Sequence, residues 1–163
     1  MTTTWPVRPL DLADEEVAAA VHRIGRAAYA VEAELIGFDG IPALHESLAD
    51  LRGRPLQWRG AVGADGEIGG FVAWEREADG TVCVDRLCVD PARFRLGIAS
   101  LLLRHLLAEL PPRVPVTVTT GAANAPAVAL YERLGFVRGA DFSPAPGLVM
   151  ASFALAPRTA DRT

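Results

Sequence analysis

One segment restricts the fold of this chain more than any other: Leu87–Ser100, which reads L-C-V-D-P-A-R-F-R-L-G-I-A-S. It predicts an apolar strand, a short basic turn, and a leucine-rich helix that begins near Gly97. The first backbone N–H groups of a helix have no partner within the helix and carry partial positive charge, so a helix start attracts anions. Gly97 and Ala99 are small enough to let an anion approach the backbone, and Arg93 and Arg95 add positive charge. The segment therefore predicts a cradle for a pyrophosphate.

Two familiar phosphate-binding loops do not explain this segment. The sequence contains no G-x-x-x-x-G-K-[ST] and no G-x-G-x-x-G. The segment instead resembles the coenzyme A loop of the GNAT acetyltransferase superfamily, usually written V-x-P-x-x-[QR]-x-x-G-x-[GA]. The residues on that pattern are Val89, Pro91, Gly97 and Ala99, whereas Phe94 stands at the Gln/Arg position.

A second motif supports the same resemblance. Asn124–Phe136 resembles the N-x-x-A-x-x-x-Y-x-x-x-G-F element of that superfamily and follows the loop at the usual distance. The resemblance implies a mixed α/β fold. We expect a twisted, mostly antiparallel sheet with helices on both faces and a splayed pair of parallel strands at the cofactor site. We expect a single N-acetyltransferase domain over residues 1–156 and a flexible C-terminal tail over residues 157–163.

Periodicity and turn residues predict the order of the elements. The expected strands are Trp5–Pro9, Gln57–Gly63, Ile68–Arg76, Val82–Val89, Val114–Thr120, Phe136–Arg138 and Leu148–Leu155, with a proline-containing loop between the last two. The expected helices are Glu15–Glu34, capped by Asp11 or Asp14, then Ala43–Leu51, Gly97–Leu110 and Asn124–Leu134. Asp65-Gly66 and Asp79-Gly80 are hairpin turn signals.

Composition limits the classes of function. Hydrophobic residues make up 50% of the chain, which is enough for one core, and the net charge of −4 argues against nucleic-acid binding. No run approaches the ~18 apolar residues that span a membrane. Cys83 and Cys88 lie at odd separation on one predicted strand, which places them on opposite faces, and they lack metal-ligand spacing. We expect a cytoplasmic protein, a monomer or homodimer, without a metal, nucleic-acid or membrane partner.

The resemblance implies acetyl-CoA as the co-substrate and assigns mainly backbone roles to its binding residues. The strand that enters the cradle is expected to pair with pantetheine and the acetyl end, and the N–H groups of the turn and helix start to bind the pyrophosphate. The residues expected to bind the cofactor are Leu87, Cys88, Val89, Phe94, Arg95, Leu96, Gly97, Ile98, Ala99, Ser100 and Asn124. Asn124 has a structural alternative as a helix cap.

Tyr131 and Asp85 are the catalytic candidates. A phenol positioned near the thioester can protonate the departing thiolate, so Tyr131 is the expected acid, with core packing as the alternative. Some relatives that acetylate protein N-termini carry a Glu base five residues before the motif Asn, where this chain has Thr119. Asp85 is then the available base, directly or through water, and its alternative is an ion pair with a neighbouring Arg. Cys88 lacks an evident partner to activate it as a nucleophile.

The acceptor is expected to be a primary amine, either a small molecule or a protein N-terminus. Glu32 and Glu34 end the first helix, where relatives build the acceptor pocket, and these two acids can receive a cationic amine or remain solvated. The expected function is acetyl transfer from acetyl-CoA to that amine by direct attack in a ternary complex. The alternatives are a longer acyl-CoA donor and a non-catalytic acyl-CoA-binding module.

Overall fold

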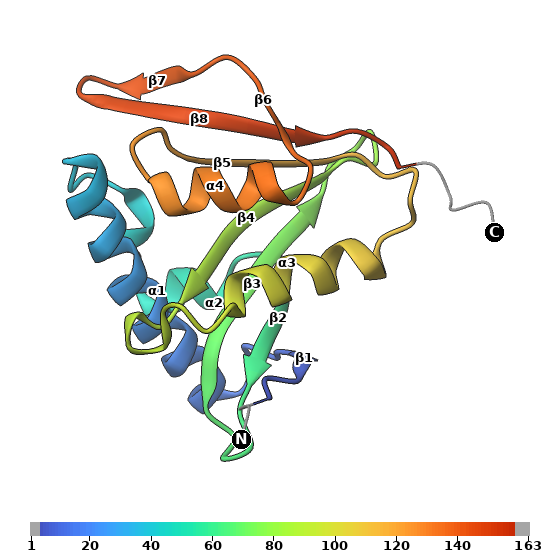
Figure 1. Cartoon of the computed structure of the whole chain (residues 1–163). Helices are drawn as coiled ribbons and strands as arrows, with labels where there is room; N and C mark the ends of the chain where they lie inside the picture. Colours follow the sequence, from blue (N-terminus) through green and yellow to red (C-terminus); the bar gives the residue numbers. More distant parts are fainter. Residues whose placement is uncertain (1–3, 159–163) are drawn as a thin grey trace.

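The computed structural model of the protein describes residues 4–158 and shows a strongly twisted sheet with helices on either side (Figure 1). The strands are β1 (Val7–Pro9), β2 (Gln57–Val62), β3 (Ile68–Arg76), β4 (Val82–Val89), β5 (Val116–Gly121), β6 (Val137–Arg138), β7 (Phe142–Ala145) and β8 (Leu148–Leu155). The α-helices are α1 (Glu15–Ile36), α2 (Leu48–Arg52), α3 (Ile98–Glu109) and α4 (Ala125–Arg133). Two short 3₁₀-helices, η1 (Pro42–His45) and η2 (Pro91–Arg93), precede α2 and α3.

The sheet has the order β1-β2-β3-β4-β5-β8-β6, and β7 also pairs with β8. Every neighbouring pair is antiparallel except β4 and β5, which are parallel and connected through α3. The predicted hairpin turns carry Gly66 and Gly80 at φ angles of 83° and 90°, in the left-handed region that glycine adopts without strain. The predicted fold class is confirmed.

The parallel pair is splayed. β4 and β5 pair at three positions only, Val82 with Val116, Cys83 with Thr117 and Val84 with Val118. Opposite β3, Trp74 pairs with Val84 and Ala73 pairs with Arg86, so Asp85 is an extra residue, a β-bulge. From this bulge onward β4 pairs with no other strand of residues 4–158 on its β5 side, which leaves backbone groups available for a ligand.

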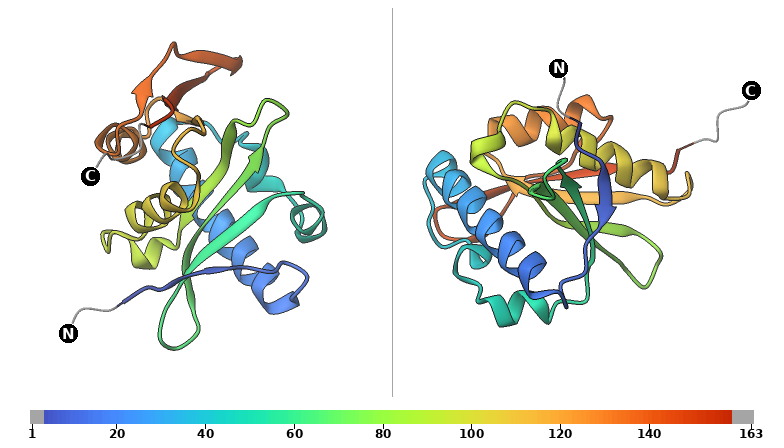
Figure 2. Two further views of the ribbon diagram at one scale, coloured as in Figure 1. Left: turned by 90° about the vertical axis from the view of Figure 1, so that its right-hand side faces the viewer. Right: turned by 90° about the horizontal axis from the view of Figure 1, so that it is seen from below.

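Two hydrophobic cores form on the two faces of the sheet. One packs α3 and α4 onto the sheet around the fully buried Leu102, Leu106 and Val72. The other packs α1 and α2 around Ile24 and Phe71. The view from below in Figure 2 shows α1 on one side of the sheet and α3 on the other.

The bulge overturns one sequence expectation. Val82 and Val84 lie in the core on the α3 side, but beyond the extra residue Leu87 and Val89 lie on that side and Cys88 faces α1. Because the alternation shifts at Asp85, Cys83 and Cys88 are on the same face of the sheet, and the prediction of opposite faces is wrong. Both thiols are free. Five residues of strand, at about 3.3 Å each, separate them too far for a disulfide.

Several element boundaries also differ from the prediction. The expected helix Ala43–Leu51 is divided, because Glu46 is extended (φ −72°, ψ 133°) and Ser47 caps α2 by accepting from the Asp50 N–H at 3.1 Å. The expected loop before β8 contains β7, which tolerates Pro144 because β7 pairs with β8 alone. Helix α1 is two residues longer than expected and ends at a left-handed Gly37.

Asp14 is the N-cap of α1: its Oδ1 accepts from the Glu16 N–H at 2.9 Å, which decides between the two predicted caps. Of the predicted tail 157–163, residues 159–163 lie outside the described residues. None of the helices within residues 4–158 combines the length and the apolar character that crossing a bilayer requires.

Candidate active site

The cradle predicted between β4 and α3 has an open backbone. Gly97 is the N-cap of α3 with φ 76°, and Arg95 also has a positive φ of 68°. Within residues 4–158, the N–H groups from Arg95 to Ser100 have no protein acceptor, whereas the next one, of Leu101, binds the Gly97 carbonyl at 3.0 Å. A Cβ added to Gly97 would meet nothing within 4 Å. The turn is therefore a row of unpaired backbone donors, as an anion site requires.

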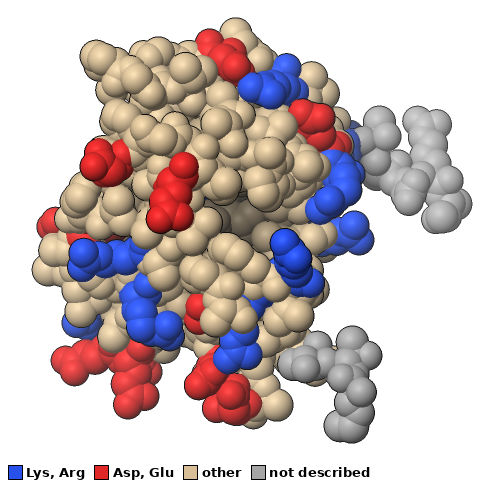
Figure 3. All heavy atoms as spheres, turned by 60° about the vertical axis from the view of Figure 1, so that its left-hand side comes forward, with Lys and Arg blue, Asp and Glu red and all other residues tan. Residues whose placement is uncertain are grey.

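The two arginines of the cradle have different surroundings. Arg93 forms an ion pair with Glu67 at 2.5 Å and lies over the ring of Trp5. Its positive charge is therefore largely balanced by groups of the protein itself. Among the described residues, Arg95 has no ion-pair partner, and it is exposed. Phe94 and Leu96 beside it are also exposed, by 44% and 57%. Figure 3 shows a hollow in this side of the molecule with arginine side chains on its lower and right-hand rims.

Tyr131 of α4 is buried against the sheet, with 4% exposure. Its ring packs on Phe136 and Phe153, with centroids 5.7 Å and 5.4 Å away. No protein group in the described part of the chain accepts a hydrogen bond from its hydroxyl. Burial raises the pKa of Tyr131, and the charges of Glu32 and Cys88 raise it further, so the phenol retains its proton at neutral pH.

Glu32 of α1 lies at the carboxyl end of β5. Its Oε1 accepts hydrogen bonds from the Thr120 hydroxyl at 3.1 Å and from the Gly121 N–H at 3.2 Å. The Thr120 hydroxyl in turn accepts from Asn124 Nδ2 at 3.4 Å. Asn124 also caps α4, since its Oδ1 accepts from the Ala127 N–H at 3.3 Å. Glu34 is exposed and has no such contact among these residues, so the two candidate acids have different positions.

Asp85 lies at the bulge, and its carboxylate is engaged. Asp85 Oδ2 accepts from Arg86 Nε at 2.7 Å, which is the ion-pair alternative considered for this residue. Arg86 also forms an ion pair with Glu46, with 3.1 Å between Nη1 and Oε1. Glu46 forms a second ion pair with Arg54 at 2.5 Å. Burial alone would raise the pKa of Glu46, but hydrogen bonds from Arg54 and Arg86 outweigh it, and the pKa lies below its ordinary value.

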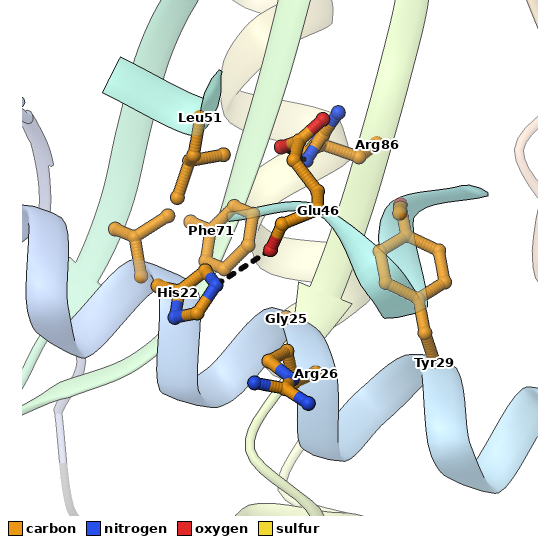
Figure 4. A pocket seen from close by; sticks show the side chains of 10 residues that line it. His22, Gly25, Arg26, Tyr29, Glu46, Leu51, Phe71 and Arg86 are labelled. Atoms are coloured by element: carbon orange, nitrogen blue, oxygen red, sulfur yellow. Dashed lines mark hydrogen bonds and ion pairs between the residues drawn. The ribbon is translucent and has the colours of Figure 1, made fainter. Parts of the chain in front are cut away.

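A small cavity of about 10 Å³ lies beside this network, between α1 and η1, with room for about one water molecule. Figure 4 shows Tyr29 and His22 of α1 on one side of it and Glu46 with Arg86 on the other. His22 Nε2 is 2.8 Å from the Glu46 carbonyl oxygen. The network fixes η1 to the sheet next to the splayed strands. Glu46, Arg86 and Tyr29 are not among the predicted site residues, although Tyr29 is one helical turn before Glu32.

Cys88 is buried on β4, and burial raises the pKa of its thiol to about 12, with a further contribution from the Glu32 charge. Burial likewise raises the pKa of Tyr29, and Cys88 adds to that shift. Tyr29, Glu32, Cys88 and Tyr131 are thus close enough to act on one another electrostatically, although they come from α1, β4 and α4. In the described part of the chain, no three His, Cys, Asp or Glu side chains are placed to hold a metal ion.

Comparison with known proteins agrees with this geometry. Residues 59–138 match the family model of the acetyltransferase (GNAT) domain. The chain is 36% identical over 132 residues to the UPF0157 protein YqkA of Bacillus subtilis, which covers 80% of this chain and 38% of that protein. It is 48% identical over 52 residues to the [Ribosomal protein bS18]-alanine N-acetyltransferase of Salmonella typhimurium, covering 31% of this chain and 35% of that enzyme. The chain thus matches little more than a third of the length of each relative.

The fold has counterparts among solved structures. That of yncA from Salmonella typhimurium, determined with its cofactor acetyl-CoA, superposes with a TM-score of 0.70 at 19% identity and covers 98% of both chains. The splayed sheet, the matched domain and the two motifs define one class of protein. The chain belongs to the GNAT acetyltransferase family.

Proposed function

We propose that this protein is an N-acetyltransferase that moves an acetyl group from acetyl-CoA to a primary amine by direct attack in a ternary complex. The observation that carries the proposal is the free edge of β4, which leads from the bulge at Asp85 to the open N–H row at Arg95–Ser100. A ligand with amide groups at one end and a pyrophosphate at the other matches these two features.

The residues present fit that cofactor. The backbone of Leu87, Cys88 and Val89 lacks a β5 partner and would pair with the pantetheine arm, and the N–H groups from Arg95 to Ser100 would bind the pyrophosphate, with Phe94 at the rim. Acetyl-CoA supplies an acetyl thioester that is activated toward amines. The open space over Gly97 supports close approach of a phosphate to the backbone.

Tyr131 is proposed as the general acid. Its raised pKa keeps the phenol protonated, and its hydroxyl has no acceptor within residues 4–158, so the proton is available to a leaving thiolate. A base is also needed when the acceptor arrives as an ammonium ion. Asp85 is the acid that β4 itself offers, but its ion pair with Arg86 counts against that role, because a protonated Asp85 would lose the pair.

The acceptor is proposed to be a small-molecule amine or the α-amine of a protein N-terminus, received near Glu32. The likeness to an enzyme named for the alanine of ribosomal protein bS18 supports testing an N-terminal alanine first. A cytoplasmic location is part of the proposal and suits the two free cysteines.

A single substitution separates an enzyme from a binding module. Tyr131→Phe keeps the ring that packs on Phe136 and Phe153 and removes the proton, so kcat should fall by ~10- to 10³-fold while the Kd for coenzyme A changes little. The wild-type protein is first assayed with acetyl-CoA against a panel of amines, with detection of free thiol. Full activity of Tyr131→Phe would make Tyr131 structural. Coenzyme binding without transfer to any amine would favour the module.

A further inference from the structure

We infer that Glu32, supplied by α1, is the general base that deprotonates the acceptor amine, and that Asp85 instead holds Arg86. The inference rests on the proposed function. The position at which some relatives carry a Glu base is Thr119 here, and Thr119 is exposed on β5, opposite Ser152. The neighbouring Thr120 is buried and binds the Glu32 carboxylate, so an acid from another element is fixed at the same end of the same strand.

The hydrogen bonds orient one oxygen of Glu32 and leave the other available. Oε1 accepts from the Thr120 hydroxyl and from the Gly121 N–H, at 3.1 Å and 3.2 Å. Within the described chain, Oε2 has no hydrogen-bond partner and no arginine lies within ion-pair distance of Glu32. Asp85 differs in this respect, because its carboxylate is bound by Arg86 at 2.7 Å. An acceptor proton can therefore go to Glu32 without breaking an ion pair.

The groups around Glu32 are those the reaction needs. They are Tyr29 on its own helix, Cys88 on β4 and Tyr131 on α4, each of which has a pKa raised in part by the Glu32 charge. Arg86 and Asp85 are on β4 next to Cys88, on the side of the bulge. Glu32 and Tyr131 thus belong to one site. Glu32 accepts the proton of the ammonium group, and Tyr131 donates the proton that goes to the departing sulfur.

The proposed proton transfers balance. Glu32 takes one proton from the R–NH₃⁺ acceptor and later releases it to solvent. The freed amine forms the C–N bond to the acetyl carbon, and the C–S bond breaks. Tyr131 gives its proton to the departing sulfur, and the second proton lost by the nitrogen restores the phenol. The products are the acetamide, coenzyme A thiol and one proton.

The Glu32→Gln variant distinguishes a catalytic role of Glu32 from a structural one. The Gln carbonyl oxygen can accept the same two hydrogen bonds from Thr120 and Gly121, so a structural role survives the change and a basic one does not. With a peptide bearing a free N-terminal alanine and with 1,4-diaminobutane as acceptors, kcat/KM should fall by ~10²-fold or more at neutral pH. The Kd for coenzyme A, measured by calorimetry, should be unchanged. The matched control is Glu15→Gln, an exposed acid at the opposite end of the same helix, which should behave as wild type.

The pH dependence and the acceptor give two further readouts. The defect of Glu32→Gln should shrink as pH rises toward the pKa of the acceptor amine, because solvent then supplies the neutral amine. It should also be small with methoxyamine, a weakly basic acceptor that is neutral at the assay pH. A constant defect at every pH, or an equal defect with methoxyamine, would overturn the inference.

Two more outcomes overturn the inference in distinguishable ways. If wild-type protein transfers acetyl groups and Glu32→Gln keeps full activity while Asp85→Asn loses it, Asp85 is the base and the proposed function stands. If wild-type protein binds coenzyme A but acetylates none of these amines, the proposed function fails and the inference fails with it.

Discussion

Replacement of Gly97 by Val tests the cofactor cradle directly. Gly97 has φ 76°, a conformation that places the Cβ of an L-residue too close to the backbone carbonyl, at about 1–2 kcal/mol per residue. Within residues 4–158, no atom beyond the chain neighbours lies within 4 Å of the added Cβ, so the substitution introduces backbone strain but no steric clash at the Cβ. The fold should therefore survive, with a melting temperature lowered by ~2–8 °C for a chain of this size.

Coenzyme binding should suffer much more than folding. The valine side chain would occupy the open space over the N–H row, and relaxation of the strained φ would turn the N–H groups of Gly97 and Ile98 away from a phosphate. Each hydrogen bond to a charged group contributes ~1.5–3 kcal/mol, so loss of one such bond weakens binding by ~10- to 150-fold. Isothermal titration with coenzyme A measures this loss, and the stabilisation of the folded protein by saturating coenzyme should shrink with it.

The chain contains a matched control. Gly80 in the β3–β4 hairpin has φ 90° and equally open surroundings, at the opposite end of β4 from the cradle. Gly80→Val should lower the melting temperature about as much as Gly97→Val and leave the Kd for coenzyme A unchanged. Normal coenzyme binding by Gly97→Val would refute the assignment of the cradle, and so would an equal loss of binding in the two variants.

Two further predictions follow from the raised pKa values. Cys88→Ala should retain acetyl transfer, and wild-type protein incubated with acetyl-CoA should gain no acetyl group on Cys88 by mass spectrometry, because burial raises the pKa of that thiol to about 12 and leaves little thiolate. The unfolded chain loses its tyrosine protons near pH ~10, whereas burial keeps Tyr29 and Tyr131 protonated in the folded state, so stability is full below that pH and declines above it. In urea titrations Tyr131→Phe should reduce this alkaline slope by up to ~1.4 kcal/mol per pH unit, and an unchanged slope would contradict the burial of the phenol.

The bulge shows what the sequence does and does not reveal about the site. The resemblance implied a splayed strand pair, and the three pairings of β4 with β5 confirm it. The position of the bulge was not predicted, although the sequence contains a signal: buried apolar residues at 82 and 84 give way to apolar residues at 87 and 89. A one-residue change of phase is what an extra residue in a strand produces. The two cysteines were assigned to opposite faces because that change was not recognised.

The ion-pair network beside the site could not be predicted from sequence alone. Glu46 and Arg86 are 40 residues apart, and each is an ordinary charged residue in its own segment. Only the packing of η1 against β4 buries both, and a buried acid is tolerated there because Arg54 and Arg86 neutralise it. Such long-range pairing has no local periodicity, so the divided helix at Glu46 was also missed.

The position of Glu32 bears on whether the family's chemistry is retained. From sequence alone, the absence of an acid at Thr119 favours a binding module, whereas the presence of Tyr131 favours an enzyme. In the structure the neighbouring Thr120 binds an acid from α1, in a chain of contacts that runs from Asn124 through Thr120 to Glu32. The motif residue Asn124 therefore has a reason to be Asn beyond capping α4, since its amide orients the hydroxyl that holds the carboxylate. Thr120→Val, which removes that hydroxyl and keeps the β-branched shape, should raise KM or lower kcat for cationic acceptors while leaving the Kd for coenzyme A unchanged.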